Sequence, residues 1–426
     1  MPKPTLAEKL KSLGVKVGTS EIMPPPAKPA SMDSVEAALD GHWVDTPLGR
    51  TLIHEAHYPL EYRHGIAPLF SSAPLHNLAN WAGDARLRDM PLGQLAFLDT
   101  ETSGLAGGTG TYAFLVGVGR FEKTESGDDF HLMQFFMRDP AEEPALLSAI
   151  EQFLAPCAAL VTFNGKAFDA PLLATRYRLN QMPVPFADFA HVDLLPLARR
   201  LWRDRLPSRA LKYLEENVLS APRTVEEVPG YEIPYLYFDF LHTGDPLPLK
   251  GVFYHNDMDV VAMTALFSHL AGLLADPHAP DHEFGLDVVA LAKLFEDMGM
   301  WDDAARLYER GLEIGLPENG FWEAVRRLAL LQRRRGDLDS ALKLWEKAAA
   351  EGHIYAHVEL SKHYEHRVKD PELALRWAKS AHKLAQAPSL PPYERKHWQA
   401  ELVKRIERLE GKVRAKKGKP AKKNSA

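Results

Sequence analysis

The sequence predicts an α/β domain, in which helices flank a mixed sheet, followed by an all-α domain of repeated helix pairs. Between residues 92 and 205, short apolar runs with strand character alternate with segments of helical periodicity. From residue 286 to residue 386 the periodicity is helical throughout, and one sequence pattern recurs along it. The length of 426 residues and the apolar content of 46% suit two or three packed domains.

Charge and cysteine content exclude several classes of protein. The net charge of -6 argues against a protein that coats nucleic acid through bulk electrostatics, although it allows a local basic groove. The single cysteine, Cys157, rules out an intramolecular disulfide, which fits a cytoplasmic protein. Charged residues precede any apolar run at the N-terminus, and we find no run of the about 18 apolar residues that a membrane span needs. We therefore expect no signal peptide and no membrane contact.

The first 90 residues divide into two segments. Residues 1–40 contain the run Pro24–Pro26 and little periodicity, which predicts a flexible N-terminal tail. Residues 41–90 carry turn signals and scattered aromatic side chains, too few for a core of their own. We expect them to form an extension that packs on the domain at residues 91–278.

The elements of that domain follow in a characteristic order. Three strand patterns are joined by loops short enough for antiparallel pairing: Leu95–Asp99, Tyr112–Phe121 and Phe130–Met137. Asp139, followed by Pro140 and Glu142, begins a helix that runs to Leu154. Strands and helices then alternate, at Ala159–Phe163, Asp169–Leu179, Ala187–Val192 and Leu194–Arg205. This order is typical of a ribonuclease-H-like α/β fold.

Residues 284–410 read as helix pairs with an internal repeat. Ala304 aligns with Ala341 at an offset of 37, and a third copy places Ala374 another 33 residues on. A period near 34, with Gly299 and Gly336 between helices, resembles tetratricopeptide repeats. Such pairs bury their apolar faces by stacking, and we expect them to bind a protein partner or to steer the substrate. Residues 411–426 are lysine-rich and are predicted to be a basic disordered tail.

Two carboxylates separated by one residue, Asp99 and Glu101, follow the first strand of the 91–278 domain. Because side chains alternate along a strand, both point to the same face. Acidic groups held this close repel each other unless something neutralises them, and a divalent cation is the usual solution. The sequence therefore predicts a metal site at the end of this strand.

Two further acids are expected to complete the site. Asp169 begins the helix after the fourth strand, and it lies beside Asp99 if the first and fourth strands are adjacent. In a helical 252–261 segment, His255 and Asp259 are four residues apart and share a face, whereas Asp257 points elsewhere. Two Mg2+ or Mn2+ ions fit this set, with Asp99 bridging both, Glu101 and Asp259 completing one, and Asp169 acting on the other through water.

Neighbouring residues have expected roles in catalysis and substrate binding. His255 is suited to take a proton from the attacking water. The predicted substrate-binding residues are Thr100, Gly104, Asn164 and Lys166. Three alternatives stay open. Asn164 is either a substrate contact or the cap of the helix that holds Asp169, and Asp193 is either an extra acid near the site or a helix cap. Residues 104–110 form a tight glycine-rich turn rather than a phosphate loop, although their backbone amides could still contact a substrate phosphate.

Three motifs carry a resemblance to a known family. Asp99-x-Glu101-x-x-Gly104, Asn164-Gly-x-x-Phe-Asp169 and His255-x-x-x-Asp259 resemble the exonuclease motifs of the DEDD (DnaQ-like) nucleases. Residues 98–114, 191–200 and 254–259 are similar to the YprB-type bacterial ribonuclease-H-like proteins, which often carry tetratricopeptide repeats. The resemblance implies metal-dependent hydrolysis of DNA or RNA, with Asp99, Glu101, Asp169 and Asp259 as metal ligands. The three residues between His255 and Asp259 match the Tyr-type spacing rather than the four of the His-type enzymes.

The predicted function is that of a metal-dependent nuclease, a 3′–5′ exonuclease by the resemblance. Two other hypotheses compete with it. The same site in a structure-specific endonuclease would cleave substrates that have no free end. A catalytically weak scaffold would act through its helical repeats and would bind no metal through Asp99.

Overall fold

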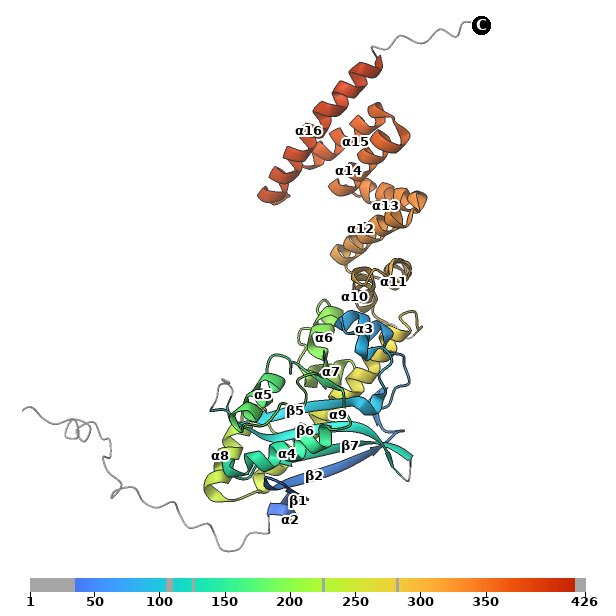
Figure 1. Cartoon of the computed structure of the whole chain (residues 1–426). Coiled ribbons are helices and arrows are strands. Elements are labelled where there is room, and N and C mark those ends of the chain that lie inside the picture. Colours follow the sequence, from blue (N-terminus) through green and yellow to red (C-terminus); the bar gives the residue numbers. More distant parts are fainter. Residues whose placement is uncertain (1–34, 105–109, 125–126, 224–226, 281–282, 418–426) are drawn as a thin grey trace, which may run out of the picture. The chain divides into compact units, whose positions relative to one another are not determined.

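The computed structural model describes residues 35–104, 110–124, 127–223, 227–280 and 283–417 (Figure 1). These residues form two compact units. The first contains the chain up to residue 197 together with residues 208–275, and the second contains residues 198–207 and the chain from residue 276.

A mixed seven-stranded sheet is the centre of the first unit. Its strand order is β1-β2-β7-β6-β5-β8-β9, in which β8 pairs in parallel with β5 and β9, and the other pairs are antiparallel. The strands are β1 His42–Thr46, β2 Gly49–Pro59, β5 Leu95–Thr102, β6 Ala113–Thr124, β7 Gly127–Phe136, β8 Ala159–Thr162 and β9 Ala190–Asp193. Strands β3 Arg63–His64 and β4 Ala67–Pro68 form a separate small hairpin. The ribonuclease-H-like α/β fold is confirmed, and the expected adjacency of the first and fourth predicted strands appears as the β5–β8 pair.

Residues 41–90, which the sequence predicts to be an extension that packs on this domain, contribute β1 and β2 to the sheet itself. Strand β2 pairs with β7 from Leu52 opposite Phe136 to Pro59 opposite Asp129. The ladder satisfies the backbone of β2, and its residues Leu52 and Ile53 are 1% exposed. The described chain also begins earlier than the predicted tail allows, with helix α2 Val35–Ala38.

Two helices cover opposite faces of the sheet. Helix α4, Glu143–Leu154, packs on β1, β2 and β7, and helix α9, Lys250–Ala275, packs on β5, β6 and β7 (Figure 1). Phe135 of β7 contacts Phe153 of α4, whereas its neighbour Gln134 hydrogen-bonds to α9. Because side chains alternate along a strand, these contacts place α4 and α9 on different sides. The remaining helices of this unit include α3 His76–Ala82, α5 Asp169–Leu179, α7 Leu211–Asn217 and α8 Ile233–Thr243, and α6 Leu194–Trp202 begins in it.

Helix α9 explains the most apolar stretch of the chain. In contrast to the expectation from sequence, Leu247–Ala275 is long and apolar enough to cross a membrane by length and composition alone. However, 67% of the most apolar 18-residue stretch of this segment is buried inside the fold. Phe267 of α9 packs edge-on against Phe97 of β5 with ring centroids 5.4 Å apart. The apolar residues of α9 are therefore those of a core helix.

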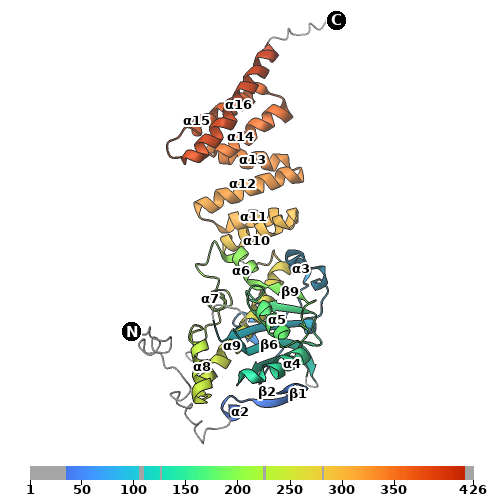
Figure 2. The ribbon, with the colours of Figure 1, turned by 60° about the vertical axis from the view of Figure 1, so that its left-hand side comes forward.

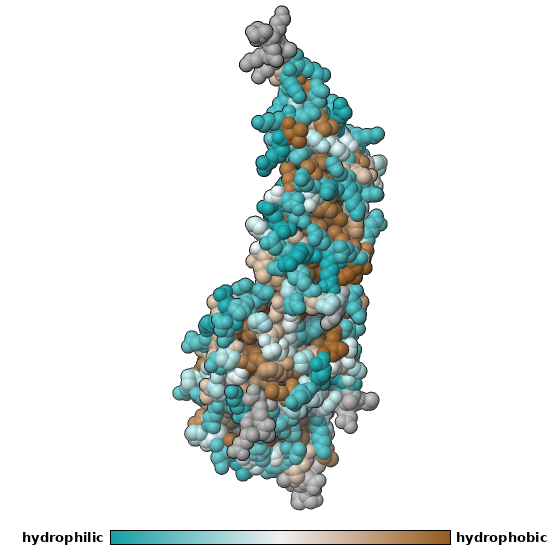
Figure 3. All heavy atoms as spheres, turned by 90° about the vertical axis from the view of Figure 1, so that its right-hand side faces the viewer, coloured by the Kyte–Doolittle hydropathy of each residue, from teal (hydrophilic) through white to brown (hydrophobic). Residues whose placement is uncertain are grey.

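The second unit is helical, and its helices pack in chain order (Figure 2). They are α10 Gly285–Asp297, α11 Trp301–Ile314, α12 Glu318–Arg335, α13 Leu338–Ala350, α14 Ile354–His363, α15 Pro371–Leu384 and α16 Pro392–Lys417. The aligned residues Ala304, Ala341 and Ala374 are fully buried. Hydrophilic side chains cover much of the face seen in Figure 3, with apolar patches between them. Whether these pairs are tetratricopeptide repeats stays a prediction.

The predicted start of the C-terminal tail at residue 411 is wrong, because α16 continues to Lys417. Glu365 anchors this helix, since its buried carboxylate pairs with Arg405, Arg408 and Lys412. These ion pairs keep the basic segment helical. Composition alone predicts a disordered tail here, because it does not reveal the pairing with a buried carboxylate.

Candidate active site

Strand β5 carries the first two acids of the predicted site. Asp99 and Glu101 share a face of β5 that looks toward α9, where the Asn256 Nδ2 donates a hydrogen bond of 2.9 Å to Asp99 Oδ2. The Glu101 side chain is 13% exposed. Both carboxylates therefore lie at the junction between the sheet and α9, and most of their surface is removed from water.

Asp169 and Asp259 approach this pair from two helices. Asp169 is the first residue of α5, and its Oδ1 accepts a hydrogen bond of 2.5 Å from Thr100 Oγ1 of β5. Burial raises the pKa of Asp99 well above its usual range, and the charges of Asp259 and Asp169 raise it further. These four residues, Asp99, Glu101, Asp169 and Asp259, are called the acidic cluster below.

The acidic cluster has the electrostatics of a cation site. Burial is the main cause that raises the pKa of Glu101, and repulsion from Asp99, Asp259 and Asp169 adds to it. The pKa of Asp169 is also raised, chiefly by burial. Carboxylates that repel one another in a dehydrated setting become stable when a hard cation with oxygen ligands neutralises them. The donor set therefore fits Mg2+ or Mn2+.

A chain of buried amides holds Asp99 in place. Gln134 Nε2 of β7 donates to Asn256 Oδ1 at 2.9 Å and to the carbonyl of Phe253 at 2.8 Å. This fixes the amide of Asn256 so that its NH2 group faces Asp99. Both amide residues are fully buried. Sequence reasoning missed them, because one buried Gln on a strand and one Asn on a helix carry no pairing signal.

Arg223 supplies a positive charge next to the acidic cluster. Its guanidinium, with a side chain only 1% exposed, pairs with Asp259, with Glu215 at 2.6 Å and with Glu227 at 2.7 Å. Burial lowers the pKa of Arg223, but the charges of Asp259 and Glu215 more than offset this, so the group stays protonated. Sequence reasoning missed Arg223, which lies in an irregular segment far from every motif.

His255 borders the acidic cluster without a short hydrogen bond to it. Its Nε2 lies 3.8 Å from Glu101 Oε1 and 3.6 Å from Asp259 Oδ2, and its Nδ1 lies 3.4 Å from Glu227 Oε1. The i, i+4 spacing places His255 and Asp259 on one face of α9, as the sequence predicted. Asp257 faces elsewhere and accepts hydrogen bonds of 2.7 and 3.0 Å from the Tyr58 hydroxyl.

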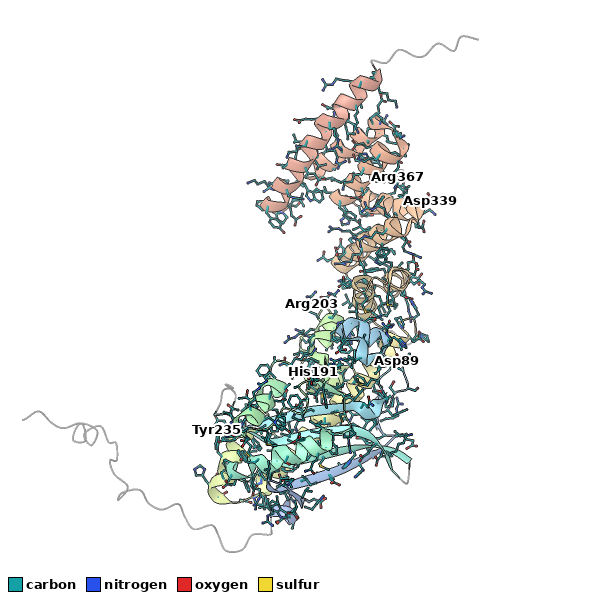
Figure 4. All side chains as sticks on the ribbon, viewed as in Figure 1. Asp89, His191, Arg203, Tyr235, Asp339 and Arg367 are labelled. Atoms are coloured by element: carbon teal, nitrogen blue, oxygen red, sulfur yellow. The ribbon has the colours of Figure 1, made fainter. Side chains whose placement is uncertain are left out.

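The loop after β8 is held by Asp193. Asp193 Oδ1 accepts from the backbone N–H groups of Asn164 at 2.8 Å and Leu195 at 3.1 Å, and its Oδ2 accepts from Lys166 N–H at 3.2 Å. Asp193 thus caps the start of α6, one of the two roles considered for it. Asn164 adopts a left-handed φ of 71° and does not cap α5, whose N-cap is Phe168. His191 of β9, labelled in Figure 4, contacts Thr162 Oγ1 of β8 at 2.8 Å.

The glycine-rich segment is only partly described. Residues 105–109 lie outside the described residues, so the predicted turn or phosphate contact there stays a prediction. Gly104 accepts a hydrogen bond of 3.0 Å from Thr102 Oγ1 at the end of β5.

Gly117 is expected to be intolerant of a side chain. A Cβ at this position of β6 would lie 2.3 Å from Asn256 Oδ1 and 3.1 Å from Val260 Cγ2, so α9 would have to move. Gly117→Ala should lower the free energy of unfolding by about 1–3 kcal/mol and weaken Mn2+ binding through Asp99. Urea denaturation and calorimetric titration with Mn2+ measure the two effects.

Gly272→Ala is the matched control. Gly272 lies on α9, the helix that a Cβ at Gly117 of β6 would displace, but a Cβ at Gly272 itself meets no atom within 4 Å. This variant should gain up to about 1 kcal/mol from helix propensity. If both variants behave alike, the close approach of β6 and α9 does not position Asn256.

Three comparisons relate the chain to known proteins. A family profile described as the RNase_H superfamily matches residues 96–271. The uncharacterized protein YprB of Bacillus subtilis (strain 168) is 34% identical over 365 residues, which cover 83% of this chain and 86% of that protein. Among solved structures, the family B DNA polymerase of the hyperthermophilic archaeon Pyrobaculum calidifontis matches with a TM-score of 0.31 and 17% identity, over 49% of this chain and 30% of that chain.

Proposed function

Because this chain belongs to the YprB family and contains an RNase H superfamily domain, which indicates a nuclease, we propose that it is a metal-dependent 3′–5′ exonuclease of the DEDD type. The substrate would be DNA or RNA, and the reaction would be hydrolysis of a phosphodiester bond. The exonuclease polarity rests on the resemblance of the three motifs to the DEDD nucleases.

The observation that carries this proposal is that Asp99 and Glu101 lie largely dehydrated and within reach of the charges of Asp169 and Asp259. These four residues come from β5, α5 and α9. Burial raises the pKa values of Asp99, Glu101 and Asp169, and the charges of Asp259 and Asp169 raise those of Asp99 and Glu101 further. We propose that these residues hold two Mg2+ or Mn2+ ions. When bound, such ions lower the pKa of an attacking water and stabilise the negative charge on the leaving 3′ oxygen.

The chain's own groups would orient the reactants and move the proton. Asn256 and Thr100 hold the carboxylates of Asp99 and Asp169 by hydrogen bonds, so their oxygens are in place before the substrate arrives. His255 Nε2, at the edge of the acidic cluster, would accept the proton of the attacking water. The loop that contains Lys166 and Asn164, whose φ is left-handed, would contact a substrate phosphate.

A nuclease panel tests the function. The full-length protein is incubated with 5′-labelled single- and double-stranded DNA and RNA, with Mn2+ and with chelator. We expect a ladder of products shortened from the 3′ end that appears with Mn2+ only. Cleavage of circular or end-blocked substrates would instead favour the endonuclease. Absence of cleavage, together with calorimetry that shows no Mn2+ binding dependent on Asp99, would favour the scaffold.

His255→Asn is expected to lower the rate constant of hydrolysis about 10²–10⁴-fold, because it removes the proposed proton acceptor. Mn2+ affinity should change little, since the four carboxylates remain. Single-turnover kinetics and calorimetry separate the two effects. A loss of Mn2+ binding equal to that of Asp99→Asn would contradict a role in proton transfer.

We also propose that the helical unit binds a protein partner or guides the substrate, and that the protein acts in the cytoplasm. Stacked helix pairs present extended surfaces suited to such contacts. A free, buried thiol at Cys157 is compatible with a reducing compartment.

A further inference from the structure

A second group of metal-ligating side chains lies on the face of the sheet opposite to α9. It consists of Glu55 and His57 of β2 and His131 of β7, called the histidine cluster below. His57 and His131 are direct partners across the β2–β7 ladder, and Glu55 lies two residues from His57 on the same face. One ligand atom from each side chain lies within 4.8 Å of the others. Figure 1 shows β2 and β7 side by side.

Both imidazoles are oriented by carboxylates through the same ring atom. His57 Nδ1 lies 3.0 Å from Asp129 Oδ2, and His131 Nδ1 is hydrogen-bonded to Glu122. With Nδ1 engaged by a carboxylate, Nε2 is the nitrogen left with a free lone pair. Metal-binding histidines are held in the same way, with a carboxylate on the ring nitrogen that does not bind the ion.

The two Nε2 atoms converge on one carboxylate oxygen. His131 Nε2 lies 3.6 Å and His57 Nε2 lies 4.0 Å from Glu55 Oε2, which is too long for hydrogen bonds. A tetrahedral ion with bonds of about 2.0–2.1 Å separates its ligands by about 3.3 Å. The two rings stack nearly in parallel, with centroids 4.3 Å apart and 13° between their planes, so the half-exposed His57 ring has to turn for both Nε2 lone pairs to reach one ion. His131 as a residue is 8% exposed, and its Nε2 has no hydrogen-bond partner among the described residues. A buried ring nitrogen without a partner is costly unless a ligand occupies it.

The charges around the histidine cluster favour a dication. Glu55, Glu122 and Asp129 bring three negative charges, and Arg120, which pairs with Glu122 at 2.8 Å, brings one positive charge. With neutral imidazoles the net charge of the described groups is therefore −2. Nitrogen ligands disfavour Mg2+, which prefers oxygen, and favour Zn2+ and similar ions.

We propose that Glu55, His57 and His131 bind one Zn2+ ion that joins β2 to β7. Two histidines and one glutamate are an established ligand set for zinc. The fourth position would be taken by water or by His42 of β1, whose Nε2 lies 3.7 Å from Glu55 Oε1. This site shares no residue with the acidic cluster, and it does not depend on the proposed nuclease activity.

Cobalt substitution and zinc titration test the proposal without reference to activity. Metal-stripped full-length protein is titrated with Co2+, and the visible absorption of a four-coordinate site is recorded, followed by displacement with Zn2+. We expect about one equivalent of the four-coordinate, Zn2+-displaceable species in the wild type and in the double variant Asp99→Asn/Glu101→Gln, because Co2+ at an oxygen-ligand site such as the acidic cluster does not give this absorption. His57→Gln, at a half-exposed position, should weaken binding at least about tenfold and abolish the Zn2+-dependent rise in melting temperature.

His54→Gln is the matched control. His54 lies on the same strand but on the other face, where its Nδ1 contacts the Asp40 carbonyl at 2.9 Å and its ring packs on Phe253. It should bind Co2+ like the wild type. The proposal fails if the protein gives no four-coordinate Co2+ spectrum, if His57→Gln and Glu55→Gln both retain it, or if the double variant of the acidic cluster loses it.

Discussion

Asp99→Asn is expected to reduce the rate of phosphodiester hydrolysis at least about 1,000-fold, which corresponds to about 4 kcal/mol of lost transition-state stabilisation. Asparagine keeps the size of the side chain and can still accept the hydrogen bond from Asn256, so the fold should be retained. What it removes is a negative charge that would hold the proposed ions. Initial rates on the best substrate of the nuclease panel, at saturating Mn2+, measure the effect.

The same variant should be more stable than the wild type when metal is absent. The pKa of Asp99 is raised in the folded protein, so its contribution to stability is fully present below the ordinary carboxyl pKa of about 4 and is lost as the pH rises through the raised value. At pH 7 in chelator, Asp99→Asn should therefore unfold at higher urea than the wild type. The difference should disappear below about pH 4, and Mn2+ should reverse it.

Asp257→Asn is the control for both measurements. Asp257 is a buried aspartate two residues from Asp259, but it faces Tyr58 instead of the acidic cluster. Activity should stay near the wild-type rate in this variant. If Asp99→Asn also hydrolyses nucleic acid at the wild-type rate, the metal assignment is wrong.

Local periodicity was sufficient to predict how the acids are arranged. Alternation along β5 places Asp99 and Glu101 on one face, and the helical repeat of α9 places His255 beside Asp259. The position of Asp169 needed one non-local assumption, the adjacency of β5 and β8, which the parallel pairing of Leu95 with Ala159 satisfies.

Features that depend on distant pairings could not be predicted. Strand β2 joins the sheet through β7, whose residues lie at least 70 positions further along the chain than their partners in β2, so residues 41–90 carried no sign of being part of it. The amide chain from Gln134 to Asn256 likewise links a strand to a helix more than a hundred residues later. In each case the determining interaction is a contact between segments that no pattern within either segment encodes.

Arg223 is the clearest example, and its removal should have the largest effect on stability. Arg223→Met leaves the buried carboxylates of Glu215 and Glu227 and the side chain of Asp259 without their shared counter-charge. Loss of one partner from a buried ion pair costs about 3–5 kcal/mol, because the remaining charges stay dehydrated. Urea unfolding in chelator should show this loss. Arg203→Met is the control, since Arg203 is 74% exposed and should change stability by less than about 0.5 kcal/mol (Figure 4).

Mn2+ should restore part of the stability of Arg223→Met, because a cation at Asp259 replaces part of the missing positive charge. Glu215 and Glu227 each keep one partner in either case, since His64 Nε2 lies 2.7 Å from Glu215 Oε1 and Lys212 pairs with Glu227. Arg223→Lys separates charge from geometry: it retains the cation but offers a single ammonium where the guanidinium reaches three carboxylates. Its stability should fall between those of the wild type and Arg223→Met. A loss below about 1 kcal/mol in Arg223→Met would mean that these carboxylates take up protons or water when the guanidinium leaves, and that Arg223 does not hold the α9 side of the site together.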